Sequence, residues 1–381
     1  MVMSKKLPQG WKKVKLGTLV NIKTGKLDAN ASSQDGEYPF FTCSVQPLRI
    51  SSYSYDCECV LVAGNGDLNV KYYNGKFDAY QRTYIIESID KNELYVKYLY
   101  YFMSKYIDVL RAKSIGGVIK YIKLGDLTDA KITIPPLEEQ ERIVSILERA
   151  EDAIRKREES NRLLDEYLKS VFVDMFGDPV TNPKGWDKKK LSELGEFKNG
   201  MNFNKSDFGY NIKFLGVSEF KYGNVINDIN ILPSLELLSE PSQDYLLKKG
   251  DIVFVRSNGS KELVGRSVLI GDLAEDTTYS GFCIRYRNKN EEVTPDYLIS
   301  LFNNDGFKSS FKQDSRGCSI NNLNQKILGE LNVIIPPREL QEKFIKIVND
   351  MEIIKKKQIN SCEELNNLFN SLMQRAFNGE L

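Results

Sequence analysis

Two short segments have residue types and spacing that suggest catalysis. The tripeptide EFK begins at Glu196 and again at Glu219, and it has the acid-x-lysine spacing of metal-dependent nucleases. In a chain with 28% charged residues such tripeptides arise by chance, and Asn21 stands where the repeat described below would need a copy of Glu196. The sequence contains no histidine, which removes the commonest general base and the Ser-His and Cys-His nucleophile systems. We predict no catalytic residues, no metal site and no enzymatic activity.

Cofactor-binding motifs are also missing from the sequence. There is no Gly-x4-Gly-Lys-Ser/Thr phosphate loop, and both Pro-Pro pairs follow isoleucine, unlike the Asn/Asp-Pro-Pro-aromatic motif of amino-methyltransferases. Six cysteines are scattered, and Cys57 and Cys59 lack the two-residue gap of zinc knuckles. We therefore expect no cofactor and mostly buried thiols.

Composition indicates a soluble globular chain of two domains. The 381 residues include 53 basic and 52 acidic side chains, so bulk charge does not attract nucleic acid, although a local basic face remains compatible with this balance. No apolar run is long enough to span a membrane, and no apolar stretch follows the basic residues at the start. We expect a cytoplasmic protein.

The chain is a tandem repeat. The segment IPPLEEQERI starts at Ile134, and IPPRELQEKF starts 201 residues later at Ile335. Upstream, GWKKVKLGTL at Gly10 resembles GWDKKKLSEL at Gly185, 175 residues later. Because the second offset is smaller, the copies share their ends while the second has a longer middle. The repeat is a constant frame around variable contents.

Each copy is predicted to contain a mixed α/β domain. Pro-x-Gly-Trp is turn chemistry leading into a short strand, and CVLVAG and DIVFVRS are short β-rich runs. YLYYFMSKYIDVL and YLISLFNNDGFKSSF have the spacing of short helices. KITIPP and LNVIIPP end each domain with an edge strand, because proline cannot continue a ladder.

A long helix follows each proline pair. Apolar residues recur at spacings of four and three from Ile143 to Met175 and from Phe344 to Ala376, which is a heptad seam with a polar interval in its middle. About 38 residues make a rod of about 57 Å. The simplest way to bury both seams is an antiparallel pairing of the two rods with approximate twofold symmetry. The alternative is that each helix packs on its own domain.

The doubled order of these motifs resembles the specificity subunit of type I restriction-modification systems over essentially the whole chain. The segments that carry the resemblance are both Gly-Trp starts, both IPP starts, and AGNGD and QRTYII in the first variable domain. The resemblance implies an α+β protein with two target recognition domains, residues 1–134 and 178–335, and two conserved spacer helices, residues 135–177 and 336–381, that form an antiparallel coiled coil.

The resemblance also implies a function and partners. Each domain would read one half of a bipartite site on double-stranded DNA, and the helices would space the domains and dock methyltransferase subunits, two of them, with restriction subunits joining through that complex. Chemistry would belong to those other subunits. Because the two middles differ, we expect an asymmetric target, with half-site centres about 10 base pairs apart.

Side chains with bidentate geometry read base edges, and glycines permit close approach to phosphate. In the first domain the candidates with these properties are Lys23, Gly25, Lys26, Gly64, Asn65, Gly66, Gln81, Arg82 and Lys120. In the second domain they are Lys198, Gly200, Lys205, Arg256, Ser257, Asn258, Lys261, Arg266 and Arg316. For the AGNGD segment a plain hairpin turn is an equal alternative.

Two other classes of protein share some of these features. A recognition subunit of a different DNA defence or modification assembly would share all of them. A coiled-coil scaffold with two protein-binding domains would share the rods but not a salt-dependent affinity for DNA.

Overall fold

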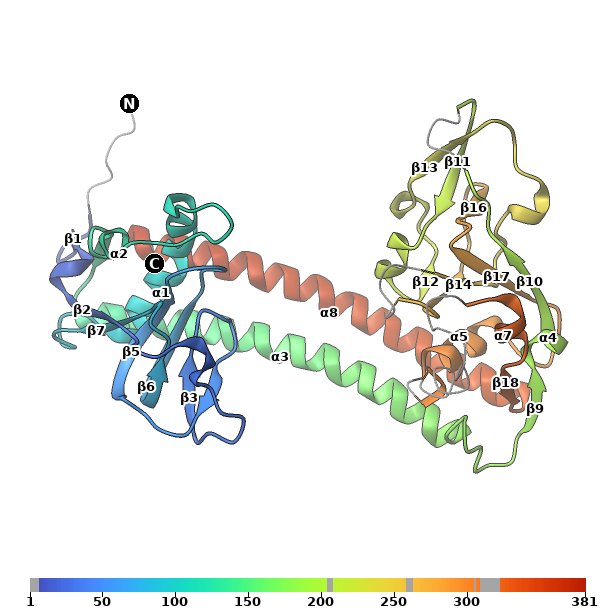
Figure 1. Ribbon diagram of the computed structural model, residues 1–381, viewed down its shortest axis with the longest axis horizontal. Coiled ribbons are helices and arrows are strands. Elements are labelled where there is room, and N and C mark those ends of the chain that lie inside the picture. The colour runs from blue at the N-terminus through green and yellow to red at the C-terminus, as the bar shows by residue number, and fades with distance from the viewer. Residues whose placement is uncertain (1–6, 204–207, 258–262, 305, 309–322) are drawn as a thin grey trace. The chain divides into compact units, whose positions relative to one another are not determined.

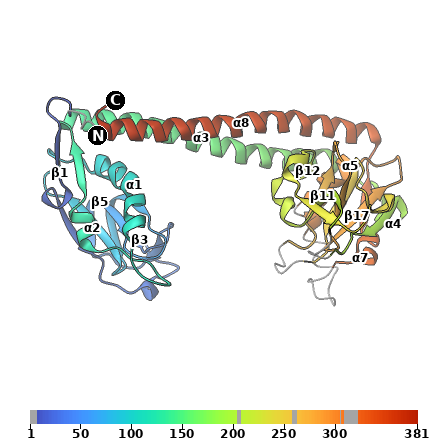
Figure 2. The ribbon, with the colours of Figure 1, turned by 90° about the horizontal axis from the view of Figure 1, so that it is seen from above.

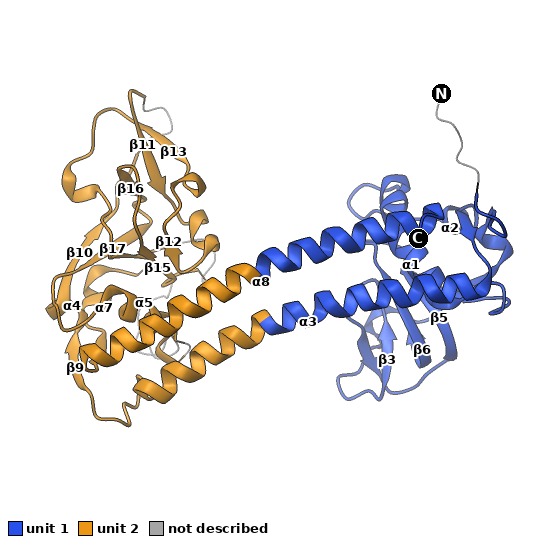
Figure 3. Cartoon of the chain, turned by 180° about the vertical axis from the view of Figure 1, so that it is seen from behind, with its two compact units in different colours: residues 1–160, 358–381 blue, residues 161–357 orange. Residues whose placement is uncertain are grey.

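The computed structural model describes residues 7–203, 208–257, 263–304, 306–308 and 323–381. These residues divide into two compact units, coloured separately in Figure 3. Unit 1 consists of residues 1–160 and 358–381, and unit 2 consists of residues 161–357. Both long helices contribute to both units, because the boundaries fall at residues 160 and 357 within them.

Unit 1 contains a two-stranded ribbon and a six-stranded sheet. In the ribbon, β1 (Lys12–Lys15) pairs antiparallel with β8 (Lys131–Ile134). The order in the larger sheet is β2 (Val20–Thr24), β7 (Thr83–Ser88), β5 (Tyr55–Ala63), β6 (Val70–Ala79), β3 (Tyr38–Phe41) and β4 (Leu48–Ile50). Helix α1 (Val96–Lys113) lies along β5 and β6, as Figure 2 shows, and α2 (Leu124–Thr128) precedes β8.

The described part of unit 2 contains three sheets, and Figure 1 labels their strands apart from β15. The ribbon pairs β9 (Asp187–Lys190) with β18 (Asn332–Ile335). A five-stranded sheet has the order β10 (Gly195–Asn199), β17 (Cys283–Asn288), β14 (Asp251–Val255), β15 (Ser267–Ile270) and β12 (Val225–Ile226). A three-stranded sheet has the order β13 (Ser234–Leu237), β11 (Tyr210–Leu215) and β16 (Thr277–Tyr279). The helices are α4 (Leu191–Leu194), α5 (Pro295–Asn303) and α7 (Gln325–Gly329).

The units share a frame and differ between its parts. The adjacent strands β2, β7 and β5 of unit 1 correspond to β10, β17 and β14 of unit 2. Helices α1 and α5 are also equivalent: Tyr98 donates to the Thr133 carbonyl at 2.7 Å, and Tyr297 donates to the Ile334 carbonyl at 3.3 Å. Three strands, β11 to β13, are described between β10 and β14, where unit 1 has two, β3 and β4, and this is where the second sequence is longer. The prediction of a constant frame around variable contents is confirmed.

The long helices are α3 (Leu137–Phe176) and α8 (Arg338–Asn378), and within each unit they lie side by side (Figure 1). In unit 1, Arg142 near the start of α3 donates to the Leu381 carbonyl beyond the end of α8 at 3.0 Å. In unit 2, Phe172 near the end of α3 packs on Phe344 near the start of α8, with ring centroids 5.5 Å apart. The helices are therefore antiparallel, and the two rods pair with each other as predicted.

The seams combine apolar burial with ionic contact. In unit 1, Ile143 and Leu147 are fully buried with Ala376, and in unit 2 the half-buried Val171 and Met175 pack on the core that contains Phe344. At the polar interval, Lys355 of α8 and Asp165 of α3 form an ion pair of 2.6 Å. Such a pair favours one register of the two helices.

One buried glutamine ties each long helix to its domain. Gln140 is fully buried, donates to the carbonyls of Glu93 at 2.8 Å and Pro135 at 3.0 Å, and accepts from the Tyr95 amide at 2.9 Å. Gln341 is equally buried and makes the same three bonds in unit 2. The Pro-Pro-x3-Gln motif is thus a structural joint between the α/β fold and the helix. Among the described residues no helix is long and apolar enough to cross a membrane.

Candidate functional site

Three loops of unit 1 meet where β5 ends and β7 begins. The Gly64 amide donates to the Arg82 carbonyl at 2.8 Å, which joins the β5–β6 loop to the turn before β7. The Ile122 amide donates to the Gly64 carbonyl at 3.0 Å, and the Gly66 amide donates to the Lys120 carbonyl at 2.9 Å. The segment before α2 therefore lies against the β5–β6 loop.

The turn after β2 lies at the same end of the sheet. The Gly25 amide donates to the Thr83 carbonyl at 3.1 Å. Segments that are far apart in the sequence and carry predicted reading residues thus come together, because antiparallel neighbours bring opposite strand ends to one edge. We define this set of loops, residues 25–27, 64–67, 80–82 and 120–122, as the reading face of unit 1.

Three of these four backbone bonds have a counterpart among the described residues of unit 2. The Gly200 amide donates to the Cys283 carbonyl at 3.0 Å, the Arg256 amide to the Phe282 carbonyl at 2.7 Å, and the Leu323 amide to the Arg256 carbonyl at 2.8 Å. The reading face of unit 2 is therefore residues 200–201, 256–257 and 280–282, with Leu323. Arg256 occupies the place of Gly64, and Phe282 the place of Arg82.

Close backbone packing requires glycine at three of the predicted positions. A Cβ atom on Gly25 would lie 2.1 Å from the Ala79 carbonyl oxygen, and one on Gly200 would lie 2.1 Å from that of Ser280. A Cβ on Gly64 would lie 2.4 Å from the Arg82 carbonyl oxygen. Gly66 differs, because its φ of +69° favours glycine while the space around it is open. The AGNGD segment is a β5–β6 hairpin connection and also a component of the reading face.

Several predicted cations are exposed on the reading face of unit 1 without an internal partner. Lys26, Arg82 and Lys120 are exposed, and their side chains form no hydrogen bond or ion pair with any residue that the structure describes. The Asn65 side chain is half-buried and its backbone pairs with that of Tyr121. In unit 2, the half-buried Arg256 has no ion pair to a described residue. Ser257 follows it, and its amide donates to the Phe282 carbonyl at 3.4 Å.

The repeat lysines Lys23 and Lys198 are held by acids of their own unit. Lys23 forms an ion pair of 2.5 Å with Glu87 and lies 5.1 Å from the centre of the Tyr55 ring. Although partial burial lowers it, the hydrogen bond and charge of Glu87 raise the pKa of Lys23 above its ordinary value. Lys198 pairs with Asp244 at 3.0 Å, and this bond lowers the pKa of Asp244. Both ammonium groups are therefore less available to a ligand.

Two more candidates have internal bonds. Gln81 donates to the Asp28 carboxylate at 2.7 Å, and Arg266 donates to the Phe220 carbonyl at 3.2 Å. Four candidates of the second domain lie outside the described residues: Lys205, Asn258, Lys261 and Arg316.

Phe282 is a reading-face residue that the sequence reasoning missed. Its side chain is 61% exposed and lies in the turn between β16 and β17, whose residues are mostly buried. An alignment of QRTYII with GFCIRY, 200 residues apart, places Phe282 opposite Arg82, and the repeat could have found it. Phe282 has neither the bidentate hydrogen-bonding geometry nor the flexibility of glycine by which the sequence candidates were defined.

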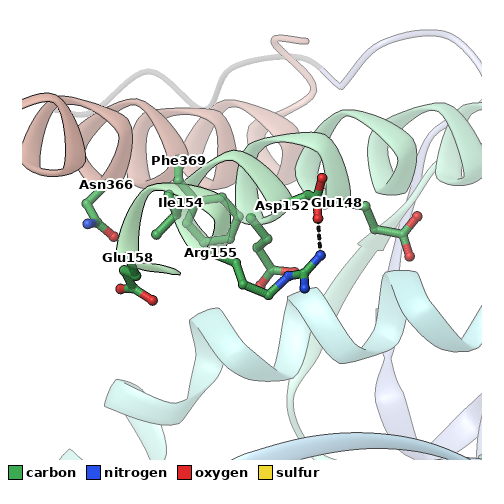
Figure 4. Close-up of a pocket in the computed structure, with 8 residues that line it drawn as sticks. Glu148, Asp152, Ile154, Arg155, Glu158, Asn366 and Phe369 are labelled. Carbon is green, nitrogen blue, oxygen red and sulfur yellow. Dashed lines mark hydrogen bonds and ion pairs between the residues drawn. The ribbon is translucent and has the colours of Figure 1, made fainter. Parts of the chain in front are cut away.

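A groove in unit 1 is lined mainly by acidic residues, unlike the reading face. It has a volume of about 760 Å³ and is lined along α3 by Glu148, Glu151, Asp152, Ile154, Arg155 and Glu158, and along α8 by Asn366 and Phe369 (Figure 4). Arg155 pairs with Asp152, as the dashed line in Figure 4 shows. Burial raises the pKa of Glu151 despite the hydrogen bond that it accepts from Tyr101 at 2.6 Å. Because acids predominate, this surface repels phosphate.

The fold and the two reading faces define a duplicated recognition protein: one scaffold is used twice with different loop side chains. A family model described as the type I restriction modification DNA specificity domain matches residues 8–164 and again residues 183–364. The chain belongs to this family. As a specificity subunit it is a non-catalytic component of its complex.

Relatives align with nearly the whole chain. The EcoDI type I restriction enzyme specificity subunit of Escherichia coli is 28% identical, with 99% of this chain and 90% of the relative covered. The MjaVIII specificity subunit of Methanocaldococcus jannaschii is 22% identical, with coverage of 94% and 91%.

Solved structures show the same fold. The S subunit of a type I restriction-modification system from M. genitalium has a TM-score of 0.58 at 18% identity, covering 99% of this chain and 98% of that one. A chain from a structure concerning complex assembly and conformational transition of the type I system has a TM-score of 0.62 at 17% identity, covering 99% and 100%. At these identities the likeness is one of fold.

Proposed function

We propose that this chain selects the DNA target of a type I restriction-modification complex, with unit 1 reading one half-site and unit 2 the other. The observation that carries the proposal is the repeated set of loop bonds, which holds Arg82 and Phe282 at equivalent positions. A constant backbone with different side chains is what two readers of different sequences require. The target is therefore asymmetric and bipartite.

Within each half-site the exposed cations and amides contact different groups of the DNA. Arg82, Lys26 and Lys120 in unit 1 and Arg256 in unit 2 are the groups best placed to contact guanine edges or phosphates. Asn65 supplies an amide, which suits adenine. Lys23, Lys198, Gln81 and Arg266 support the loops and act on DNA only if their internal bonds are exchanged for DNA bonds.

The long helices are the proposed docking surface for methyltransferase subunits, one for each unit and hence two in all. The unit 1 groove is acidic, so the matching surface of the partner should be basic. In unit 2 the exposed apolar residues Leu163, Tyr167 and Ile353 on α3 and α8 supply buried area for the second copy. Restriction subunits join through the assembled methyltransferase.

A map of methylated adenines across the genome of the source cell tests this function. We expect one asymmetric bipartite motif to be methylated when the gene is intact and unmethylated when the gene is deleted. The deletion strain complemented with the gene should regain that motif and no other. Unchanged methylation after deletion, in a cell that expresses the subunit, would overturn the proposal.

A further inference from the structure

An exposed apolar finger stands beside the reading face of unit 1. It comprises residues 114–121, closed by a two-bond bridge in which the Ile115 amide donates to the Tyr121 carbonyl at 3.0 Å and the reverse bond measures 2.9 Å. The side chains of Val118 and Ile119 lie at its tip; Val118 is fully exposed and Ile119 is 61% exposed. Exposing two adjacent branched aliphatic side chains is unfavourable in water unless something covers them.

The finger is built to hold this position. Gly116 has φ of +124°, and a Cβ there would lie 2.4 Å from the Ile119 carbonyl oxygen, so the tight turn at the tip requires glycine. The base is anchored to the reading face by the Asn65–Tyr121 bridge and by the bond from the Gly66 amide to the Lys120 carbonyl. The tip is therefore an extension of the surface that we assign to DNA.

Charge around the finger favours DNA over a protein partner. The segment from Lys113 to Lys123 contains three lysines and no acidic residue. Lys120 and Lys123 are exposed, and Arg82 lies on the adjoining loop, bonded through its carbonyl to Gly64. An apolar tip between ammonium groups matches a DNA groove, whose rims are phosphates and whose floor is formed by base edges.

We propose that Val118 and Ile119 enter the major groove of the half-site read by unit 1 and contact the C5-methyl group of thymine. The proposal rests on the function proposed above. In that groove the methyl group is the largest apolar group of a base edge, while the groups that distinguish the other bases are hydrogen-bond donors or acceptors that an aliphatic side chain would leave unsatisfied. The finger is thus a specificity element for a thymine-containing position.

Thymine and deoxyuridine differ by this methyl group, so their exchange tests the contact directly. Duplexes carrying the mapped motif are made with single thymine-to-deoxyuridine exchanges at each position of both half-sites. Their affinity for the intact methyltransferase complex is measured at one fixed salt concentration. At one or two positions of a single half-site we expect affinity to fall about fourfold per methyl group removed.

The variant Val118→Ser/Ile119→Ser should lose that discrimination. We expect it to bind thymine DNA about tenfold more weakly than wild type and to bind thymine and deoxyuridine DNA equally at those positions. Sensitivity to exchanges in the other half-site should be unchanged. Because both side chains are exposed, the melting temperature should not change.

Ile89→Ser is the matched control. Ile89 is 58% exposed and follows β7 at the strand end opposite the reading face, so its substitution should leave both affinity and methyl discrimination at wild-type values. A complex that selects no sequence would contradict the proposed function itself. A complex that binds its motif, but with no sensitivity to deoxyuridine in either half-site, or with sensitivity that survives in the Val118/Ile119 variant, would overturn the finger proposal alone.

Discussion

The reading faces of the two units have the same backbone and opposite side-chain chemistry. In unit 1 the turn before β7 presents Arg82, and its bonding partner is Gly64; in unit 2 the equivalent turn presents Phe282, and its partner is Arg256. The cation and the small or apolar residue have exchanged loops while the hydrogen bonds remain. On the proposed function, substitution at these loop positions changes specificity while the backbone bonds remain.

The charged groups behind the reading faces also differ. In unit 1, the strand lysine Lys23 and its partner Glu87 are both partly exposed. In unit 2, Arg287 on β17 makes two bonds of 2.7 Å to Asp251, which is almost fully buried and also accepts from the Lys248 amide at 2.7 Å. Unit 2 thus depends on a buried ion pair where unit 1 relies on an exposed one.

The largest effects should come from the feature in which the units agree. Replacing Gln140 by leucine leaves two buried carbonyls and one buried amide without a hydrogen-bond partner. Replacing Gln341 does the same in unit 2. At roughly 1–3 kcal/mol for each unsatisfied group, we expect each variant to lower the free energy of unfolding of its unit by about 4 kcal/mol. Urea unfolding, monitored by hydrogen exchange within each unit, measures this change in unfolding free energy.

Gln374→Leu on α8 supplies the control, because Gln374 is exposed and its substitution should change stability by less than about 0.5 kcal/mol. A loss of less than 1 kcal/mol in only one of the two joint variants would show that the joints are not equivalent, and the comparison of the frames would fail at that point.

The next largest effect should be a difference in stability loss between the units when their buried and exposed ion pairs are broken. Asp251→Asn leaves Arg287 buried without its counter-charge, and we expect a loss of about 3 kcal/mol in unit 2. Glu87→Gln breaks a partly exposed pair, so the loss in unit 1 should be below about 1 kcal/mol. Thermal unfolding of both variants at neutral pH gives the two values. Equal losses would mean that the difference in burial has no energetic consequence.

The sequence was sufficient for the frame and insufficient for the reading face. Repeated motifs and heptad spacing predicted the long helices, their antiparallel pairing and the short strand that begins each copy, because local patterns carry those signals. Whether Lys23 or Lys198 is free depends on Glu87 and Asp244, which come from other parts of the fold. Glu87 is placed beside Lys23 by the register of β2 with β7, whereas Asp244 reaches Lys198 from a short 3-10 helix outside the sheet. Residue spacing alone gives neither placement. Phe282 was missed for a different reason: it is an aromatic residue in the turn between the consecutive strands β16 and β17, and neither bidentate geometry nor glycine flexibility selects it.

The smallest effects should come from substitution of Arg82 and Phe282. The two substitutions should differ in their effect on the salt dependence of DNA affinity. Arg82→Ala removes a cation, so we expect about tenfold weaker binding of the complex to its motif and a salt dependence of the logarithm of affinity that is shallower by about 1. Phe282→Ala removes apolar area without charge, so affinity should fall about three- to tenfold while the salt dependence stays as in wild type.

Titration of motif DNA at several salt concentrations distinguishes the two variants. Each should also relax selectivity in one half-site only, which single-base substitutions in each half would reveal. If both variants relaxed the same half-site, Arg82 and Phe282 would not serve separate readers, and the one-unit, one-half-site assignment would be wrong. If the salt dependence fell equally in both, the exchange of chemistry between the two loops would have no counterpart at the DNA. Separate half-sites with separate salt signatures would mean that each loop position acts on its own DNA segment through the group it presents.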